Sequence, residues 1–137
     1  MITGRDIANK ARELVDVRFH HQGRSREGLD CGGLIALDCT ELGLAVVDAT
    51  GYPRTPDLPF MRRFLGWNAR EVPDRPPLEG MVLLFIILRI QPHLGILVAP
   101  EWFVHTYESM AKVMLTRFDP KWQARVDSVW ELNGVVR

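Results

Sequence analysis

The stretch Leu29–Leu37 reads LDCGGLIAL and places a cysteine at the start of a predicted helix. Asp30 is a residue type that caps helices, because its side-chain oxygen accepts a hydrogen bond from an unpaired N–H of the first turn. The apolar residues that follow predict a helix from Cys31 to about Leu42, which Gly43 ends. The peptide dipoles at a helix N-terminus stabilise negative charge, so this position favours the thiolate of Cys31, which is the nucleophilic form.

The other predicted elements divide the chain into helices first and strands afterwards. Thr3 to about Asp16 has a capping pattern and helical apolar spacing, the polar segment Phe19–Gly28 is expected to be a loop, and Phe60–Gly66 a short helix. Strands are predicted at Met81–Ile90, His93–Ala99, Trp102–Tyr107, Lys112–Phe118 and around Val129–Leu132, with a turn at Gln91-Pro92 and a short helix opening at Asp119-Pro120. This order predicts an α+β fold in which helices pack on an antiparallel sheet.

Length, charge and hydropathy limit the class of protein. A chain of 137 residues is expected to form one domain, spanning 1–137, and 47% hydrophobic residues suffice for a core. Seventeen basic and seventeen acidic residues leave no net charge, which argues against a general binder of nucleic acid or of anionic membranes. The most apolar run is broken by Arg89 and residues 91–93, so no membrane span is expected. The first residues contain no apolar signal-peptide core, so we expect synthesis in the cytoplasm without an export signal.

Neither the cysteines nor the histidines form a metal-binding pattern. Cys31 and Cys39 lie eight residues apart on one predicted helix, roughly 12 Å, which is too far for a disulfide. Cys39 is expected to be structural. His20 and His21 are adjacent, which favours two polar loop residues over a pair of ligands. We therefore expect neither a metal nor a cofactor.

Two histidines can supply the base that a cysteine nucleophile needs. His93 and His105 lie twelve residues apart on strands expected to be neighbours, and neighbouring strands are about 4.8 Å apart. His93 can then take a proton from Cys31, and His105 can fix the tautomer and orientation of His93. The alternative for each histidine alone is a hydrogen-bonded core or surface ring, and for Cys31 an inert buried thiol.

Four stretches together resemble the NlpC-type family of papain-like cell-wall cysteine peptidases, which hydrolyse bacterial peptidoglycan stem peptides. They are VRFHHQGRSREGLDCGGLI (Val17–Ile35), LEGMVLLF (Leu78–Phe85), HLGILV (His93–Val98) and FVHTYE (Phe103–Glu108). The likeness runs from about Leu14 to Trp130 in the order of the family. The loop sequence FHHQGRS, the short length and the missing signal peptide are most similar to the branch encoded with phage tails and phage-like particles.

The resemblance implies a papain-like α+β fold, with the nucleophile-bearing helix packed on an antiparallel sheet. It implies that Cys31 is the nucleophile, His93 the general base and His105 the residue that orients it, while Asp30 helps to hold the free amine of the substrate. The implied reaction is amide hydrolysis through a thioester, typically between D-γ-glutamyl and a diamino acid. The implied partners are a peptidoglycan stem peptide and other tail proteins, which would carry this chain to the cell wall.

Three positions depart from the pattern of the family. Phe19 stands where many members have a tyrosine whose hydroxyl assists the oxyanion, Gly32 where a serine usually follows the cysteine, and Met81 where an acid is usual. Together with Asp30, Phe19 and Gly32 are the expected substrate-binding positions. The departures favour an alternative, a catalytically weak or inactive structural component of a tail tip with the same fold. A third possibility keeps the Cys-His machinery and changes the acyl substrate.

Overall fold

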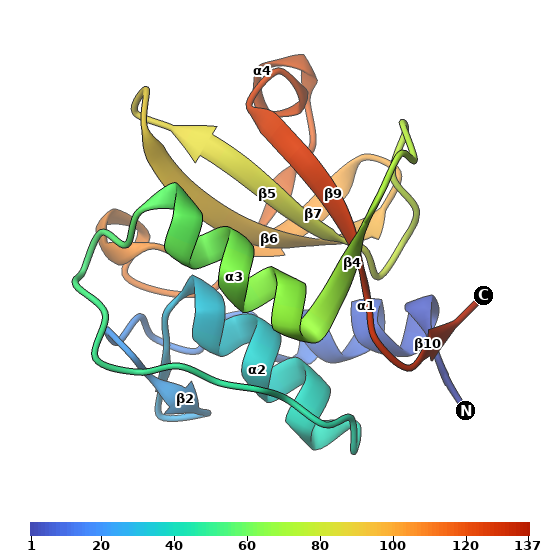
Figure 1. Cartoon of the computed structure of the whole chain (residues 1–137), viewed down its shortest axis with the longest axis horizontal. Coiled ribbons are helices and arrows are strands. Elements are labelled where there is room, and N and C mark those ends of the chain that lie inside the picture. The colour runs from blue at the N-terminus through green and yellow to red at the C-terminus, as the bar shows by residue number, and fades with distance from the viewer.

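The computed structural model describes residues Met1–Arg137, with a six-stranded antiparallel sheet at the centre of the fold (Figure 1). The strand order is β4-β9-β5-β6-β7-β8. These strands are β4 (Ala69–Val72), β5 (Val82–Ile87), β6 (Gln91–Ala99), β7 (Trp102–His105), β8 (Met114–Arg117) and β9 (Val126–Leu132). The strands β5 to β8 form the predicted meander. The last long strand, β9, returns to pair with β4 and β5 inside the sheet.

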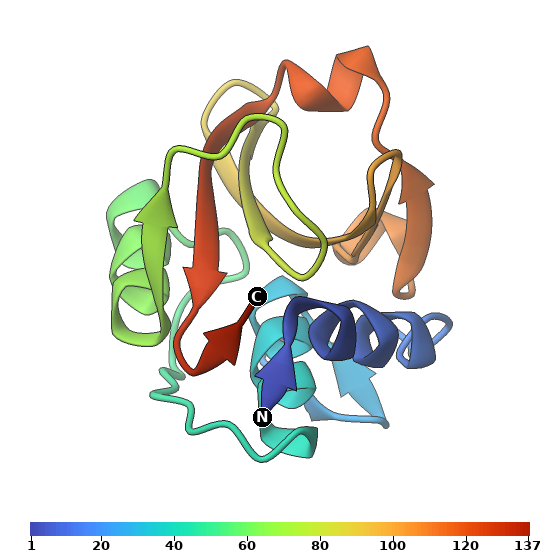
Figure 2. The same ribbon diagram turned by 90° about the vertical axis from the view of Figure 1, so that its right-hand side faces the viewer.

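Three helices cover one face of the sheet: α1 (Gly4–Glu13), α2 (Cys31–Glu41) and α3 (Leu58–Asn68). Figure 2 shows the curved sheet with α1 and α2 beneath it and the short helix α4 (Pro120–Gln123) above it. The sheet therefore separates two apolar clusters. The larger cluster contains the buried sides of α1, α2 and α3, and the smaller one is rich in aromatic rings, including Phe85, Phe103, Phe118 and Trp122.

The predicted helices are confirmed, because their local signals act as expected. Thr3 caps α1 in a complete capping box with Asp6, and Asp30 caps α2 through a bond from the Gly33 N–H. The helix α3 is longer than predicted because Asp57 caps it and starts it two residues earlier.

Three details of the predicted strands differ. The turn between β5 and β6 lies at residues 88–90, not at Gln91-Pro92, because Leu88 and Arg89 take left-handed φ values of 47° and 75°. The segment predicted as a loop contains a small hairpin of β2 (Arg24–Ser25) and β3 (Gly28–Leu29). Two short pairings were not predicted: the strand β4, and a parallel pair of β1 (Ile2–Thr3) with β10 (Val135–Val136).

Asp38 is an unusual member of the core. It lies on α2, facing α1, with 0% exposure, and neither carboxylate oxygen has a hydrogen-bond partner. Burial raises the pKa of Asp38 to about 9, the positive charge of Lys10 opposes this, and the negative charges of Glu13 and Glu41 add to it. The folded protein therefore holds this carboxyl group protonated at neutral pH.

We expect Asp38→Asn to stabilise the fold in a pH-dependent way. The pKa of Asp38 is higher in the folded protein than in the unfolded chain. Its contribution to the free energy of unfolding is therefore fully present below about pH 4 and is lost as the pH rises toward 9. The free energy of unfolding of the variant minus that of wild type should be larger at pH 8 than at pH 4 by about 2 kcal/mol or more. Urea denaturation at both pH values measures this, with Asp74→Asn in the connection between β4 and β5 as control. An equal difference at both pH values would mean that Asp38 is ionised in the folded protein.

Candidate active site

The nucleophile candidate occupies the first residue of α2. The Gly33 N–H donates to Asp30 Oδ1 at 2.8 Å, which fixes the start of the helix. A Cβ at Gly33 would collide with the backbone oxygen of Gly23, so this position requires glycine. A Cβ at Gly32 would meet its nearest neighbours at 3.7 to 3.8 Å, an ordinary contact. The two adjacent glycines thus differ: Gly33 allows the close approach of the loop, whereas Gly32 leaves space beside Cys31.

The sheet brings the two predicted histidines together. His105 on β7 lies opposite Gly95 on β6, so His93 is its diagonal neighbour. His93 Nε2 lies 2.8 Å from His105 Nδ1, and both rings are buried. On its other side, His105 Nε2 lies 2.8 Å from Thr116 Oγ1 on β8. Thr116 was not predicted, since a threonine in a strand carries no sequence signal for this contact.

These hydrogen bonds define which tautomer of His93 can act as a base. His93 Nδ1 is the ring nitrogen without a partner in the protein, so it is the one available to a thiol. To accept a proton there, His93 must carry its own hydrogen on Nε2 and donate it to His105 Nδ1. His105 then carries its hydrogen on Nε2 and donates it to Thr116. The three residues form a hydrogen-bonded row, and the Thr116 hydroxyl, which can donate or accept, is compatible with this tautomer of His105.

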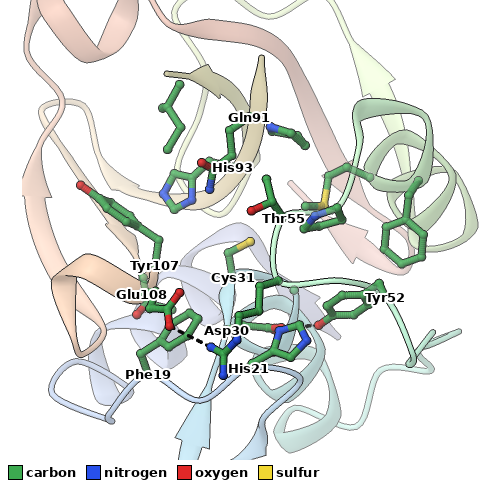
Figure 3. Close-up of a pocket in the computed structure, with 18 of the residues that line it drawn as sticks. Phe19, His21, Asp30, Cys31, Tyr52, Thr55, Gln91, His93, Tyr107 and Glu108 are labelled. Atoms are coloured by element: carbon green, nitrogen blue, oxygen red, sulfur yellow. Dashed lines mark hydrogen bonds and ion pairs between the residues drawn. The ribbon is translucent and has the colours of Figure 1, made fainter. Parts of the chain in front are cut away.

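Cys31 and His93 face the same cavity, which has a volume of about 330 Å³ (Figure 3). No hydrogen bond joins the Cys31 sulfur to the His93 ring. Phe19 also lines the cavity, and its ring supplies no hydroxyl. His21 lies in a turn, as predicted for a loop residue, and it also lines the cavity with its ring edge-on to that of Tyr52 at 5.5 Å between centroids.

The predicted thiolate is not the resting form of Cys31. Burial raises the pKa of Cys31 to about 12, and the negative charge of Asp30 adds to this. The N–H groups of Leu94 and Gly32 and the charge of Arg24 act in the opposite direction and are too weak to reverse it. The helix N-terminus therefore does not outweigh desolvation.

The two histidines are also neutral. Burial lowers the pKa of His93 well below its usual value, and the neighbouring His105 adds to this. Burial alone lowers the pKa of His105 to about 3. The resting site is therefore a neutral thiol facing a neutral imidazole.

Both carboxylate oxygens of Asp30 accept hydrogen bonds from donors within the protein. Oδ1 accepts from the Gly33 N–H and from Arg24 Nη1 at 2.9 Å, and Oδ2 accepts from the Gln22 N–H at 2.9 Å and from the Tyr52 hydroxyl. Burial raises the pKa of Tyr52, and its bond to the Asp30 carboxylate adds to this. Four donors satisfy the carboxylate internally, which leaves no free oxygen for the predicted contact with a substrate amine.

Two further features lie away from this cavity. Met81, the third departure from the family pattern, is buried in the aromatic-rich cluster on the other face of the sheet. Cys39 is buried in the larger cluster and is a free thiol, as is Cys31.

No three His, Cys, Asp or Glu side chains lie close enough to hold a metal ion. None of the helices is both long and apolar enough to cross a membrane.

The fold is shared with solved NlpC/P60 structures. NlpC2 from Trichomonas vaginalis superposes with a TM-score of 0.68 and 18% identity over 93% of this chain and 47% of its own. An NlpC/P60 family protein from Bacillus cereus ATCC 10987 superposes with a TM-score of 0.68 and 16% identity over 93% of this chain and 39% of its own. The NlpC/p60 domain of the peptidoglycan hydrolase SagA superposes with a TM-score of 0.68 and 15% identity over 95% of this chain and 99% of its own.

The chain spans less than half the length of the first two proteins and nearly all of the SagA domain. No family model matches the sequence, and no curated protein matches it. The structural likeness confirms the predicted papain-like α+β fold, in which the helix that carries Cys31 packs against an antiparallel sheet.

Proposed function

We propose that this chain is a cysteine peptidase or amidase that cleaves peptidoglycan stem peptides through a thioester on Cys31. The observation that carries the proposal is the shared cavity of Cys31 and His93, in which the far nitrogen of His93 is held by His105. The NlpC/P60 fold, and the peptidoglycan hydrolase activity named for the SagA protein, support the substrate class.

The resting protonation states require proton transfer during attack. As the Cys31 sulfur adds to the substrate carbonyl carbon, its proton passes to His93 Nδ1, and the imidazolium is stabilised by its bond to His105. First-turn N–H groups have no intrahelical acceptor, so that of Cys31 can donate to the oxyanion. Collapse of the intermediate breaks the C–N bond, and the leaving amine takes the proton from His93. Water, deprotonated by His93, then hydrolyses the thioester and restores the thiol.

The finer parts of the proposal rest on the sequence resemblance. We assign the cleaved bond to D-γ-glutamyl–diamino acid, and the setting to a phage or phage-like tail. In that setting the protein is made in the cytoplasm and reaches the cell wall as a passenger of the particle. The sequence FHHQGRS at residues 19–25 supports this branch.

Digestion of purified stem peptides by the wild-type protein, read by mass spectrometry, tests the proposal. Cleavage is expected, with product masses that identify the bond, and treatment with iodoacetamide should stop it by blocking Cys31. Intact peptides after incubation with folded protein would overturn the proposal.

The second candidate function is a structural component of a tail tip with little or no catalysis. Phe19 favours it, because loss of one oxyanion donor costs about 100- to 1,000-fold in rate. The same digestion assay separates the two when Phe19→Tyr is included. Cleavage by Phe19→Tyr but not by wild type would favour a structural protein that has lost the donor and kept the rest of the site.

A further inference from the structure

The cavity contains two carboxylates and two guanidinium groups, and they are not equally available. The carboxylates are Asp30 and Glu108, and the guanidinium groups belong to Arg24 and Arg54. All four donors to Asp30 come from the protein. The guanidinium of Arg24 donates to Asp30, Asp48, the Tyr52 hydroxyl and two backbone carbonyls. This inner pair is therefore saturated by its own surroundings.

The outer pair, Arg54 and Glu108, is not saturated in this way. Arg54 Nη1 donates to Glu108 Oε1 at 2.8 Å, and this is the only hydrogen bond that either side chain makes. Both side chains are largely exposed, at 63% and 66%. Arg54 belongs to the segment before α3 and Glu108 opens the short 3₁₀ helix η1 (Glu108–Met110), so the contact joins two stretches 54 residues apart at the cavity wall (Figure 3).

Replacing the internal partner of a charged group by a ligand costs little free energy at the outer pair, Arg54 and Glu108, and much at the inner pair, Arg24 and Asp30. An exposed ion pair is weak because water solvates both charges. Removing Asp30 from its partners would instead leave the Tyr52 hydroxyl and the N–H groups of Gln22 and Gly33 without their acceptor. A charged ligand that enters the cavity therefore finds its replaceable counter-charges at Arg54 and Glu108.

We propose that Glu108 binds the free amine of the substrate and that Arg54 binds a substrate carboxylate, each replacing the other as partner. The ligand class is a short zwitterionic peptide, and the inference rests on the proposed stem-peptide hydrolase. It moves recognition of the amine from Asp30 at the start of α2, which the resemblance implied, to Glu108 at the start of η1.

Calorimetric binding to the Cys31→Ala protein tests the inference without turnover. The probes are a stem peptide with a free N-terminal amine and the same peptide N-acetylated. Glu108→Gln, added to Cys31→Ala, should weaken binding of the free-amine peptide about tenfold, because a charge-assisted hydrogen bond is lost. It should leave the acetylated peptide unaffected. Arg54→Gln should weaken both peptides.

The control is Glu101→Gln, which removes another exposed ion pair, with Arg117 at 3.4 Å, and should change neither affinity. Unchanged affinity in Glu108→Gln would overturn the inference, and so would failure of the Cys31→Ala protein to bind the free-amine peptide. Loss of free-amine preference in Asp30→Asn but not in Glu108→Gln would return recognition of the amine to Asp30. Wild type that binds but does not cleave would contradict the hydrolase and leave the binding result intact.

Discussion

Cys31→Ala is expected to reduce cleavage of stem peptides by about 10⁴-fold or more, because the reaction then has no nucleophile. The fold should survive, since Cys31 is only half-buried and alanine is the most favourable residue in a helix. The free energy of unfolding should change by less than about 1 kcal/mol. The measurements are kcat/KM on a stem peptide and the urea midpoint.

Cys39→Ala is the matched control. Cys39 lies on the same helix and is 4% exposed within the larger apolar cluster. Its truncation should lower the free energy of unfolding by about 1 kcal/mol and leave kcat unchanged. Cleavage retained by Cys31→Ala would mean that another residue attacks, or that the activity belongs to a contaminant.

His93→Gln is expected to lower kcat by about 10²- to 10⁴-fold, because no positioned base then takes the proton of a thiol that is protonated at rest. His105→Asn should have a smaller effect, since the asparagine carbonyl can still accept from His93 Nε2. His20→Gln, on the exposed loop, should change nothing. Equal losses in His93→Gln and His20→Gln would contradict the assigned base.

The pH profile gives the same assignment an independent readout. His93 acts as a base in its neutral form, and its pKa lies well below 6.5 because the ring is buried. As the pH falls below 6.5, the ring therefore stays neutral, and kcat/KM of wild type should be maintained at pH 5.5. A decline centred at or above pH 6.5, with the protein still folded, would show that His93 titrates as an ordinary exposed histidine.

The start of α2 was predictable because its signals are local. Asp30, Cys31 and the two glycines occupy four consecutive positions, and capping depends only on neighbours within one turn. The pairing of His93 with His105 followed from their spacing across a short connection. By contrast, Thr116 reaches His105 through the register of β7 with β8, and no local pattern specifies that register.

The errors have equally definite causes. A proline was expected to mark the turn at Gln91-Pro92, but Leu88 and Arg89 form it with left-handed backbone that apolar and long side chains rarely adopt. The charge state of Cys31 was mispredicted because sequence shows the helix dipole and does not show the burial that opposes it. The internal hydrogen bonds that occupy Asp30 include one from Tyr52, which lies 22 residues away in an irregular segment.

The hydrogen bonds around Asp30 also constrain how this sequence can evolve. The side chains of Arg24 and Tyr52 both donate to one carboxylate, and that carboxylate caps the helix that carries Cys31. Replacement of one member leaves the others with buried polar groups that have no partner, whereas a coordinated replacement need not. Substitutions at these positions are therefore expected to occur together. The effect of a single substitution should depend on the residues present at the other positions. Selection on any one of them acts, through the cap, on the position of Cys31.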